Sequence, residues 1–231
     1  MSKVELRVPV DAVPEVTKGR ILDIAERLLA DHGVTATSIR MITDAAGVNV
    51  AAVNYHFGNK HELVQSVINR RATALEALRT TALDALDERT ARENRKPTIE
   101  EIAEALIAPI MTQALAEGSG WPHFMRFVSR LAWEPGGDKF EAPESSIRML
   151  QRIDKTLQQA LPHLADNSAK RVSRAMFMRG ATQHTVMVLT AARANPLPKD
   201  RPLAAMVANT ADVESVKREL ITFVAAGLSA P

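Results

Sequence analysis

Asn54, Tyr55 and His56 are consecutive residues that place an amide, a phenol and an imidazole side by side. Val53 and Phe57 flank them four positions apart, which is the spacing of the buried side of a helix. The opposite, outward side of that helix would carry Val50, Ala51, Ala52, Asn54, Tyr55 and His56. Such polar groups hydrogen-bond to phosphate oxygens and to base edges, and alanines let a backbone approach a surface closely. The chemistry that this stretch offers is therefore contact with a DNA duplex.

A second short helix must hold that surface in place, because a helix of about two turns is unstable alone in water. Its apolar stripe is expected at helical spacing and consists of Ile39, Ile42 and Ala46. Thr37 or Ser38 is suited to cap its N-terminus. Gly47 fits a left-handed turn, and Asn49 fits the cap of the next helix. Two helices joined by a glycine turn, the second with a polar outer face, are typical of a helix-turn-helix.

The same pattern also fits an ordinary helical hairpin whose polar face is simply solvated. A helical protein-interaction module with no DNA role is a further alternative. Replacement of Tyr55 or His56 by Ala separates these interpretations, since only a DNA-binding protein would lose affinity for DNA.

Residues Ile21 to Leu63 resemble the N-terminal DNA-binding domain of the TetR family of one-component transcriptional regulators. The matching pieces, in order, are Ile-Leu-Asp-Ile-Ala-Glu-Arg-Leu-Leu-Ala-Asp-His-Gly, Thr-Ser-Ile-Arg, Ala-Gly-Val-Asn and Tyr-His-Phe-Gly-Asn-Lys-His-Glu-Leu. Their order and spacing are far more specific than a bare helix-turn-helix. The resemblance implies an all-α protein, with an N-terminal three-helix helix-turn-helix domain and a C-terminal helical ligand-binding and dimerisation domain.

The outward face and the resemblance together give a set of candidate DNA contacts: Ser38, Arg40, Asn49, Val50, Ala51, Ala52, Asn54, Tyr55, His56 and Lys60. Asn59 and Glu62 form a capping-box variant at the start of the following helix. The free N–H groups and positive partial charge of a helix N-terminus suit a phosphate, and Lys60 adds a cation there. Acidic and basic residues are balanced over the first sixty positions. The arrangement of side chains, and not net charge, must therefore carry the DNA contact.

Composition excludes several classes of function. The chain has 231 residues, of which 46% are apolar and 24% charged, as in ordinary globular proteins. It has no cysteine, which excludes disulfides, thiolate nucleophiles and Cys-bound zinc. The six histidines lie apart, and no Gly-x-Ser-x-Gly or P-loop is present. We therefore expect no enzyme, no catalytic residue, no metal and no cofactor. Neither a membrane-spanning run nor a signal peptide is indicated, so we expect a cytoplasmic protein with no membrane partner.

Three segments are expected along the chain. Residues 1–15, with two prolines and mixed charge, form a flexible N-terminal arm. Residues 16–62 form the helix-turn-helix domain. Residues 63–231 form the helical ligand-binding and dimerisation domain, in which a loop with Pro196, Pro198 and Pro202 precedes the last helix.

The last two long helices are the expected homodimer interface. The final helix, from about Asp212, has an apolar stripe near heptad spacing: Val213, Val216, Leu220, Phe223 and Leu228. The helix before it carries no charged residue between Gly180 and Ala192. Two such helices can form a four-helix bundle with a copy of the same pair. The family resemblance favours this dimer, which doubles the DNA site that is read; packing within one chain is the alternative.

The helical body is expected to enclose a pocket for a small hydrophobic effector. Phe-Met-Arg-Phe at Phe124 to Phe127 resembles the fatty-acid or acyl-coenzyme-A responsive members of the family. Nine methionines and few aromatic residues suit a flexible aliphatic ligand. The candidate lining residues are Met111, Leu115, Phe127, Leu131, Met149, Ile153 and Met178. The expected function is a ligand-responsive repressor that binds a palindromic operator as a homodimer.

Overall fold

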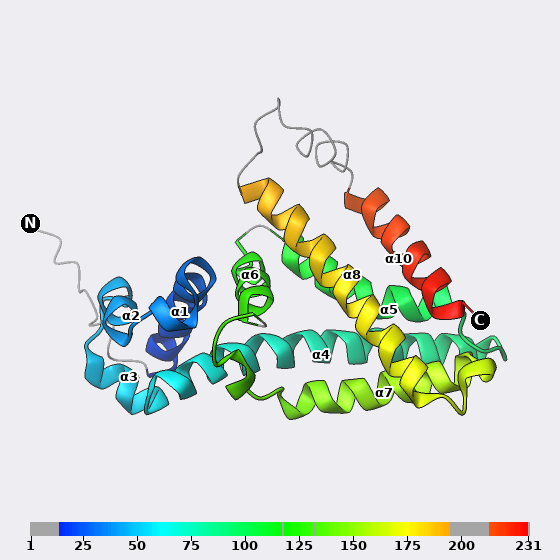
Figure 1. Ribbon diagram of the computed structural model, residues 1–231, viewed down its shortest axis with the longest axis horizontal. Coiled ribbons are helices and arrows are strands. Elements are labelled where there is room, and N and C mark those ends of the chain that lie inside the picture. Colours follow the sequence, from blue (N-terminus) through cyan, green and yellow to red (C-terminus); the bar gives the residue numbers. More distant parts are fainter. Residues whose placement is uncertain (1–13, 117, 132, 195–212, 231) are drawn as a thin grey trace, which may run out of the picture. The chain divides into compact units, whose positions relative to one another are not determined.

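The computed structural model describes residues 14–116, 118–131, 133–194 and 213–230 (Figure 1). Every regular element within these ranges is helical, which confirms the predicted all-α fold. The chain divides into two compact units: Met1–Asn69 with Phe127–Glu141, and Arg70–Arg126 with Ala142–Pro231. The predicted arm lies outside the described residues except for Pro14 and Glu15, and the predicted proline loop lies outside them entirely.

The first unit contains α1 (Pro14–Ala36), α2 (Ile39–Ala46), α3 (Val50–Phe57) and the start of α4 (Lys60–Arg92). Its core is aliphatic and includes Ile21, Leu29, Ile42, Val53 and Leu63, all fully buried. α1 begins at Pro14, because proline fits the first turn of a helix. At Gly33 the backbone leaves helical geometry, with φ 80° and ψ 175°.

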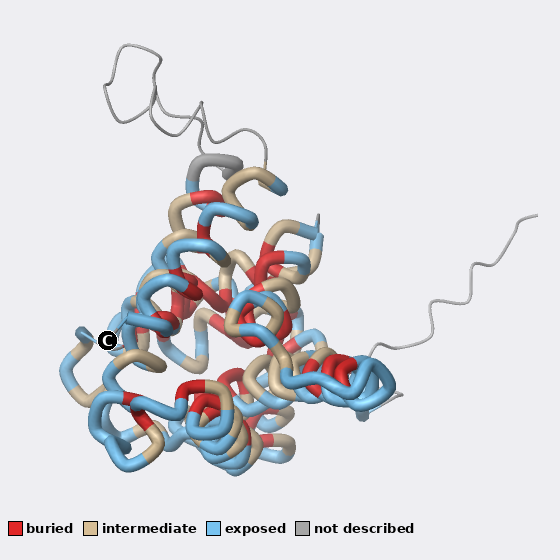
Figure 2. The backbone as a smooth tube through the Cα atoms, turned by 90° about the vertical axis from the view of Figure 1, so that its right-hand side faces the viewer, coloured by how far each residue is buried: buried red, intermediate tan, exposed pale blue. Residues whose placement is uncertain are grey.

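The second unit contains most of α4, then α5 (Ile99–Leu115), the first part of α6 (Trp121–Leu131), α7 (Glu144–Ala160), α8 (Ser168–Ala194) and α10 (Val213–Ser229). α10 packs against α5 and α8, and α8 packs against α7. Buried residues follow the sides of the helices that face their neighbours (Figure 2). The short 3-10 helices η2 (Gly137–Lys139) and η3 (Pro162–Leu164) lie on either side of α7 in the sequence.

Polar groups fix the turn between α7 and α8. The guanidinium of Arg171 is buried and donates to Asp154 Oδ1 at 2.8 Å and to the carbonyl oxygen of Leu164 at 2.7 Å. The hydrogen bond from Arg171 holds the pKa of Asp154 below its ordinary value. A buried charge that is paired and fully hydrogen-bonded in this way defines one geometry for the turn. None of the helices in the described ranges is long and apolar enough to cross a membrane.

Candidate nucleic-acid interface

Local capping fixes the geometry between α2 and α3. The Ser38 hydroxyl accepts from the Met41 N–H at 3.1 Å, and Asn49 Oδ1 accepts from the Ala52 N–H at 2.8 Å. Gly47 adopts φ 62° and ψ 39°, the left-handed conformation that favours glycine. The two caps and the turn therefore form where the residue types predict them.

The outward face of α3 is open to solvent. Val53 and Phe57 are buried, whereas Asn54 and Tyr55 on the other side are exposed, with 81% of Tyr55 accessible. The Tyr55 ring meets the half-buried ring of His56 edge to face, with 5.0 Å between centroids. This face also presents the exposed residues Asn49, Val50 and Ala51 and the half-buried Ala52. Solvated aromatic and amide groups on a capped, two-turn helix can enter a major groove without any rearrangement of the core.

Groups suited to phosphate lie at two further helix starts. Ser38 and Arg40 stand at the beginning of α2, and the Arg40 side chain is 88% exposed. Its distance of 3.8 Å to Asp44 describes a solvated pair of little energetic weight. Lys60 opens α4, where Asn59 Oδ1 accepts from the Glu62 N–H at 3.0 Å. The structure thus brings the predicted DNA contacts into one compact unit.

One part of this unit has no local signature in the sequence. Residues Phe127–Glu141 belong to it, although they follow α3 by about seventy positions. Glu134 reaches the backbone N–H of Val34, a hydrogen bond between residues 100 positions apart. Periodicity and capping are local signals, so they cannot reveal a contact over this separation.

The residues predicted to line an effector pocket are distributed over both units. Phe127 and Leu131 belong to the first unit, and the others to the second. All are buried except Leu115, which is half-buried. Among the described residues, no group of three His, Asp or Glu side chains is placed to hold a metal ion. Burial alone does not separate a ligand pocket from ordinary core, so the pocket remains a prediction.

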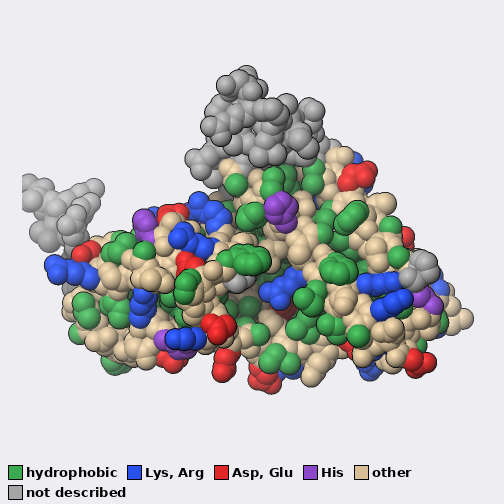
Figure 3. All heavy atoms as spheres, in the orientation of Figure 1, with side chains coloured by type: hydrophobic (Ala, Val, Ile, Leu, Met, Phe, Trp, Pro, Cys, Tyr) green, Lys and Arg blue, Asp and Glu red, His purple; other side chains and the backbone are tan. Residues whose placement is uncertain are grey.

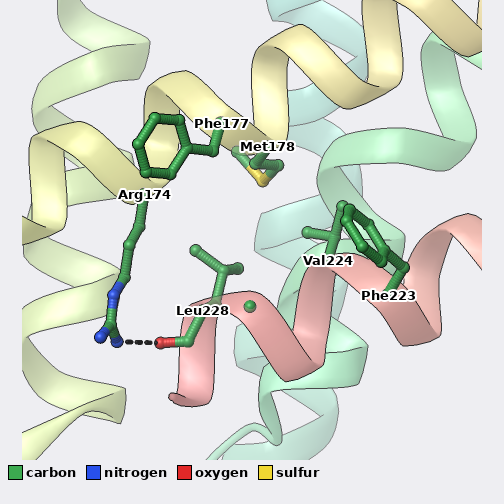
Figure 4. A pocket seen from close by; sticks show the side chains of 7 residues that line it. Arg174, Phe177, Met178, Phe223, Val224 and Leu228 are labelled. Atoms are coloured by element: carbon green, nitrogen blue, oxygen red, sulfur yellow. Dashed lines mark hydrogen bonds between the residues drawn. The ribbon is translucent and has the colours of Figure 1, made fainter. Parts of the chain in front are cut away.

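A groove of about 260 Å³ lies between α8 and α10 in the second unit (Figure 4). Arg174, Phe177 and Met178 line it from α8, and Phe223, Val224, Gly227 and Leu228 line it from α10. The Arg174 guanidinium donates to the carbonyl oxygen of Leu228 at 2.6 Å, which ties the two helices together at one end. Of the predicted pocket residues, Met178 lines this groove.

Large apolar side chains cover the outer surface of the same two helices. Val172, Met176 and Phe177 on α8 and Phe223 on α10 are each more than half exposed. In Figure 3, hydrophobic side chains lie at the surface over α8 and α10. Exposed apolar groups on neighbouring helices are typical of a protein–protein interface.

Known proteins match this chain over both its halves. The family model described as bacterial regulatory proteins, tetR family, matches residues 21–67, and the one described as tetracyclin repressor-like, C-terminal domain, matches residues 104–227. The HTH-type transcriptional repressor KstR2 of Rhodococcus jostii is 37% identical, over 29% of this chain and 42% of that protein. The HTH-type transcriptional regulator TtgR of Pseudomonas putida is 40% identical, over 23% of this chain and 25% of that protein. These matches thus cover less than half the length of either regulator.

Solved structures share the fold across nearly the whole chain. The ketosteroid transcriptional regulator KstR2 of Mycobacterium tuberculosis aligns with a TM-score of 0.54 at 18% identity, over 93% of this chain and 95% of that one. The fatty acid degradation regulator FadR of Bacillus halodurans aligns with a TM-score of 0.57 at 17% identity, over 92% and 96%. The C-terminal family model alone matches more than half of the chain, which confirms the predicted resemblance. The chain belongs to the tetR family of bacterial regulatory proteins.

Proposed function

We propose that the protein is a ligand-responsive transcriptional repressor whose homodimer binds a palindromic operator and releases it when a small hydrophobic effector binds. The observation that carries this proposal is the solvated outer face of α3, with Asn54 and Tyr55 exposed on a helix that Asn49 caps. In a family of DNA-binding regulators, an exposed aromatic and an amide on this helix are best explained as groups that meet DNA.

α3 would lie in the major groove, where Asn54, Tyr55 and His56 reach base edges. Ser38 and Arg40 at the start of α2, and Lys60 at the start of α4, would contact phosphates on either side. Helix N-termini favour anions, so these contacts fix the orientation of α3. Base contacts then supply the preference for one sequence.

Two copies are needed because one two-turn helix reads few base pairs. The exposed apolar residues on α8 and α10 are the surface that would join them, as a four-helix bundle across a two-fold axis. Burial of Phe177 and Phe223, now 72% and 70% exposed, would provide the hydrophobic driving force. Such a dimer carries two DNA-binding units and binds an inverted repeat.

The effector proposed for the body is a flexible aliphatic compound of the acyl class. The methionine-rich composition supports it, because the unbranched thioether side chain adapts to a flexible ligand. Met111, Leu115, Phe127, Leu131, Met149, Ile153 and Met178 are the proposed lining. Among the proteins that share the fold, FadR of Bacillus halodurans is a fatty acid degradation regulator and KstR2 of Mycobacterium tuberculosis is a ketosteroid transcriptional regulator, so a steroid is the second ligand class to test.

The experiment that tests the proposal compares Tyr55→Ala with the parent chain in a DNA-binding titration on the DNA upstream of its own gene. We expect the variant to lose about 1–3 kcal/mol of binding free energy while its thermal melting stays unchanged, since Tyr55 is exposed. Ile147→Ala, at an exposed apolar residue of α7, is the control and should bind as the parent does. Unchanged DNA affinity in both Tyr55→Ala and His56→Ala would instead support a protein-interaction module.

A second titration tests the effector. Fatty acids and their coenzyme A thioesters of graded chain length are added to the protein–DNA complex, with a ketosteroid in a parallel series. We expect release of the DNA by the acyl series. Release by the ketosteroid alone would overturn the proposed ligand class and leave the DNA-binding function intact.

A further inference from the structure

One carboxylate from a distant part of the chain contacts the kink at Gly33, near the C-terminal end of α1. Glu134 Oε2 accepts from the Val34 N–H at 2.8 Å, and its Oε1 accepts from Arg130 Nε at 2.8 Å. Arg130 Nη1 also donates to the carbonyl oxygen of Asp31 at 3.2 Å. The Glu134 side chain is only 13% exposed, and its hydrogen bond with Val34 is partly buried, whereas the Arg130 side chain is 46% exposed.

The absence of a side chain at Gly33 leaves room for the Glu134 carboxylate. Gly33 has φ +80°, and a Cβ at this position would lie 1.7 Å from Glu134 Oε1. The Gly33 carbonyl oxygen in turn accepts from the Thr37 hydroxyl at 2.7 Å and from the Thr37 N–H at 3.3 Å. Thr37 precedes Ser38, the cap of α2. Glu134 is therefore linked to the helix start that carries Ser38 and Arg40 through its hydrogen bond with Val34 and the hydrogen bonds between Gly33 and Thr37.

The segment that begins at Glu134 also contacts the start of α4, through Phe140 and Glu141. The Gln65 side-chain amide donates to the Glu141 carbonyl oxygen at 2.9 Å and accepts from the Glu141 N–H at 3.1 Å. The ring of Phe140 stacks on His61, with centroids 4.8 Å apart and planes at 15°. Both contacts lie within two turns of Lys60.

We propose that residues Glu134–Glu141, here named the head strap, position the two helix starts that carry the proposed phosphate contacts, and so set how well the first unit, here named the head, binds DNA. The inference rests on the proposed function of the head. One anchor of the strap fixes the start of α2 and the other fixes the start of α4. Glu134 and Gln65 are positioning residues, because they act on the proposed phosphate contacts only through the helix starts that they hold.

Hydrogen exchange of the full-length protein tests the anchor without DNA. We compare the parent, Glu134→Ala and Glu134→Gln at the amides from Val34 to Met41. Gln keeps an oxygen that accepts from the Val34 N–H, whereas Ala keeps none. We expect exchange in this stretch to rise about tenfold or more in Glu134→Ala, as an opened hydrogen bond implies, and to stay near the parent rate in Glu134→Gln. Unchanged exchange in Glu134→Ala overturns the inference.

The salt dependence of DNA affinity tests whether loss of the Glu134 contact also removes a phosphate contact. It separates this effect from general destabilisation of the protein. Each phosphate contact contributes about 0.9 to the slope of log affinity against log salt concentration. We expect Glu134→Ala to lower that slope by about 1 and the affinity about tenfold, with Glu134→Gln close to the parent. Partial unfolding would reduce the active fraction and leave the slope unchanged. An unchanged slope with unchanged affinity contradicts the inference.

Glu144→Ala is the matched control, because it also removes one carboxylate but its ion pair is with Arg148 on the same helix. It should match the parent in both measurements. If Glu134→Ala does not fold, Gln65→Ala tests the second anchor by exchange at the start of α4, where unchanged rates overturn the inference. If the parent protein binds no DNA, the proposed function of the head is wrong. Hydrogen exchange then still decides whether the strap positions the start of α2.

Discussion

At the scale of single residues, a few positions decide how the helix-turn-helix is built. The residue types predict a cap for α2 at Thr37 or Ser38, a left-handed turn at Gly47 and a cap for α3 at Asn49, because capping and left-handed turns depend only on nearby backbone. The structure confirms the turn and both caps, with Ser38 as the cap of α2. The contact of Glu134 with Val34 was not predicted, since the residues around either position do not indicate a contact partner 100 positions away. Caps and turns can thus be predicted from nearby residues, whereas hydrogen bonds between distant residues cannot.

Gly47→Ala should destabilise the protein by about 1–2 kcal/mol, because a Cβ is costly at φ +62°. That Cβ would also lie 3.0 Å from Arg20 Nη2, which must shift. Gly19→Ala in α1 is the control: no atom lies within 4 Å of its Cβ, and we expect a gain of about 0.5–1 kcal/mol. Urea denaturation measures both, and equal stability of the two variants would refute this explanation.

Two substitutions of Asn49 should separate its effect on protein stability from its effect on DNA affinity. Asn49→Ala removes the cap of α3 and is expected to cost about 1 kcal/mol of stability. Asn49→Asp keeps the cap, so its melting temperature should stay near the parent value, while its negative charge close to phosphate weakens DNA affinity. Melting curves and DNA titrations on the same samples check both effects. Full DNA affinity in Asn49→Asp would place Asn49 away from the DNA.

At the scale of elements, helices with strong caps and periodicity were predicted well. The two short helices on either side of Gly47 and the final helix appear where the sequence predicts them. The membership of Phe127–Glu141 in the first unit had no signature, because it depends on tertiary contacts such as Gln65 with Glu141.

The capping box of α5 predicts a pH dependence. The hydrogen bonds from Arg95 and from the Thr98 N–H lower the pKa of Glu101 from 4.5 to about 2. A pKa depressed in the folded state stabilises the protein above the unfolded pKa, and this contribution is lost as pH falls from 4.5 towards 2. The stability difference between the parent and Glu101→Gln should therefore be constant from pH 7 to about 5 and shrink below that. Urea midpoints measured down to about pH 3 check this, and a difference that stays constant throughout would contradict it.

At the scale of the whole molecule, the proposed function depends on two copies acting together. Phe223→Asp places a charge on the exposed apolar face of α10 and should convert the proposed dimer to a monomer. Helical content should persist, because Phe223 is largely exposed in the single chain. Leu150→Asp, at an exposed apolar residue of α7, is the control and should stay dimeric. Sedimentation equilibrium decides, and a Phe223→Asp variant that remains dimeric would place the interface elsewhere.

The most direct test of the central claim is a selection of duplexes from a random-sequence library by the purified full-length protein, followed by footprinting. We predict enrichment of an inverted repeat whose half-sites are separated by about one helical turn, or a multiple of it. We also predict that Tyr55→Ala binds this site about tenfold or more weakly than the parent. Absence of any enriched repeat, or equal binding by Tyr55→Ala, would contradict the assignment of α3 as the surface that reads DNA.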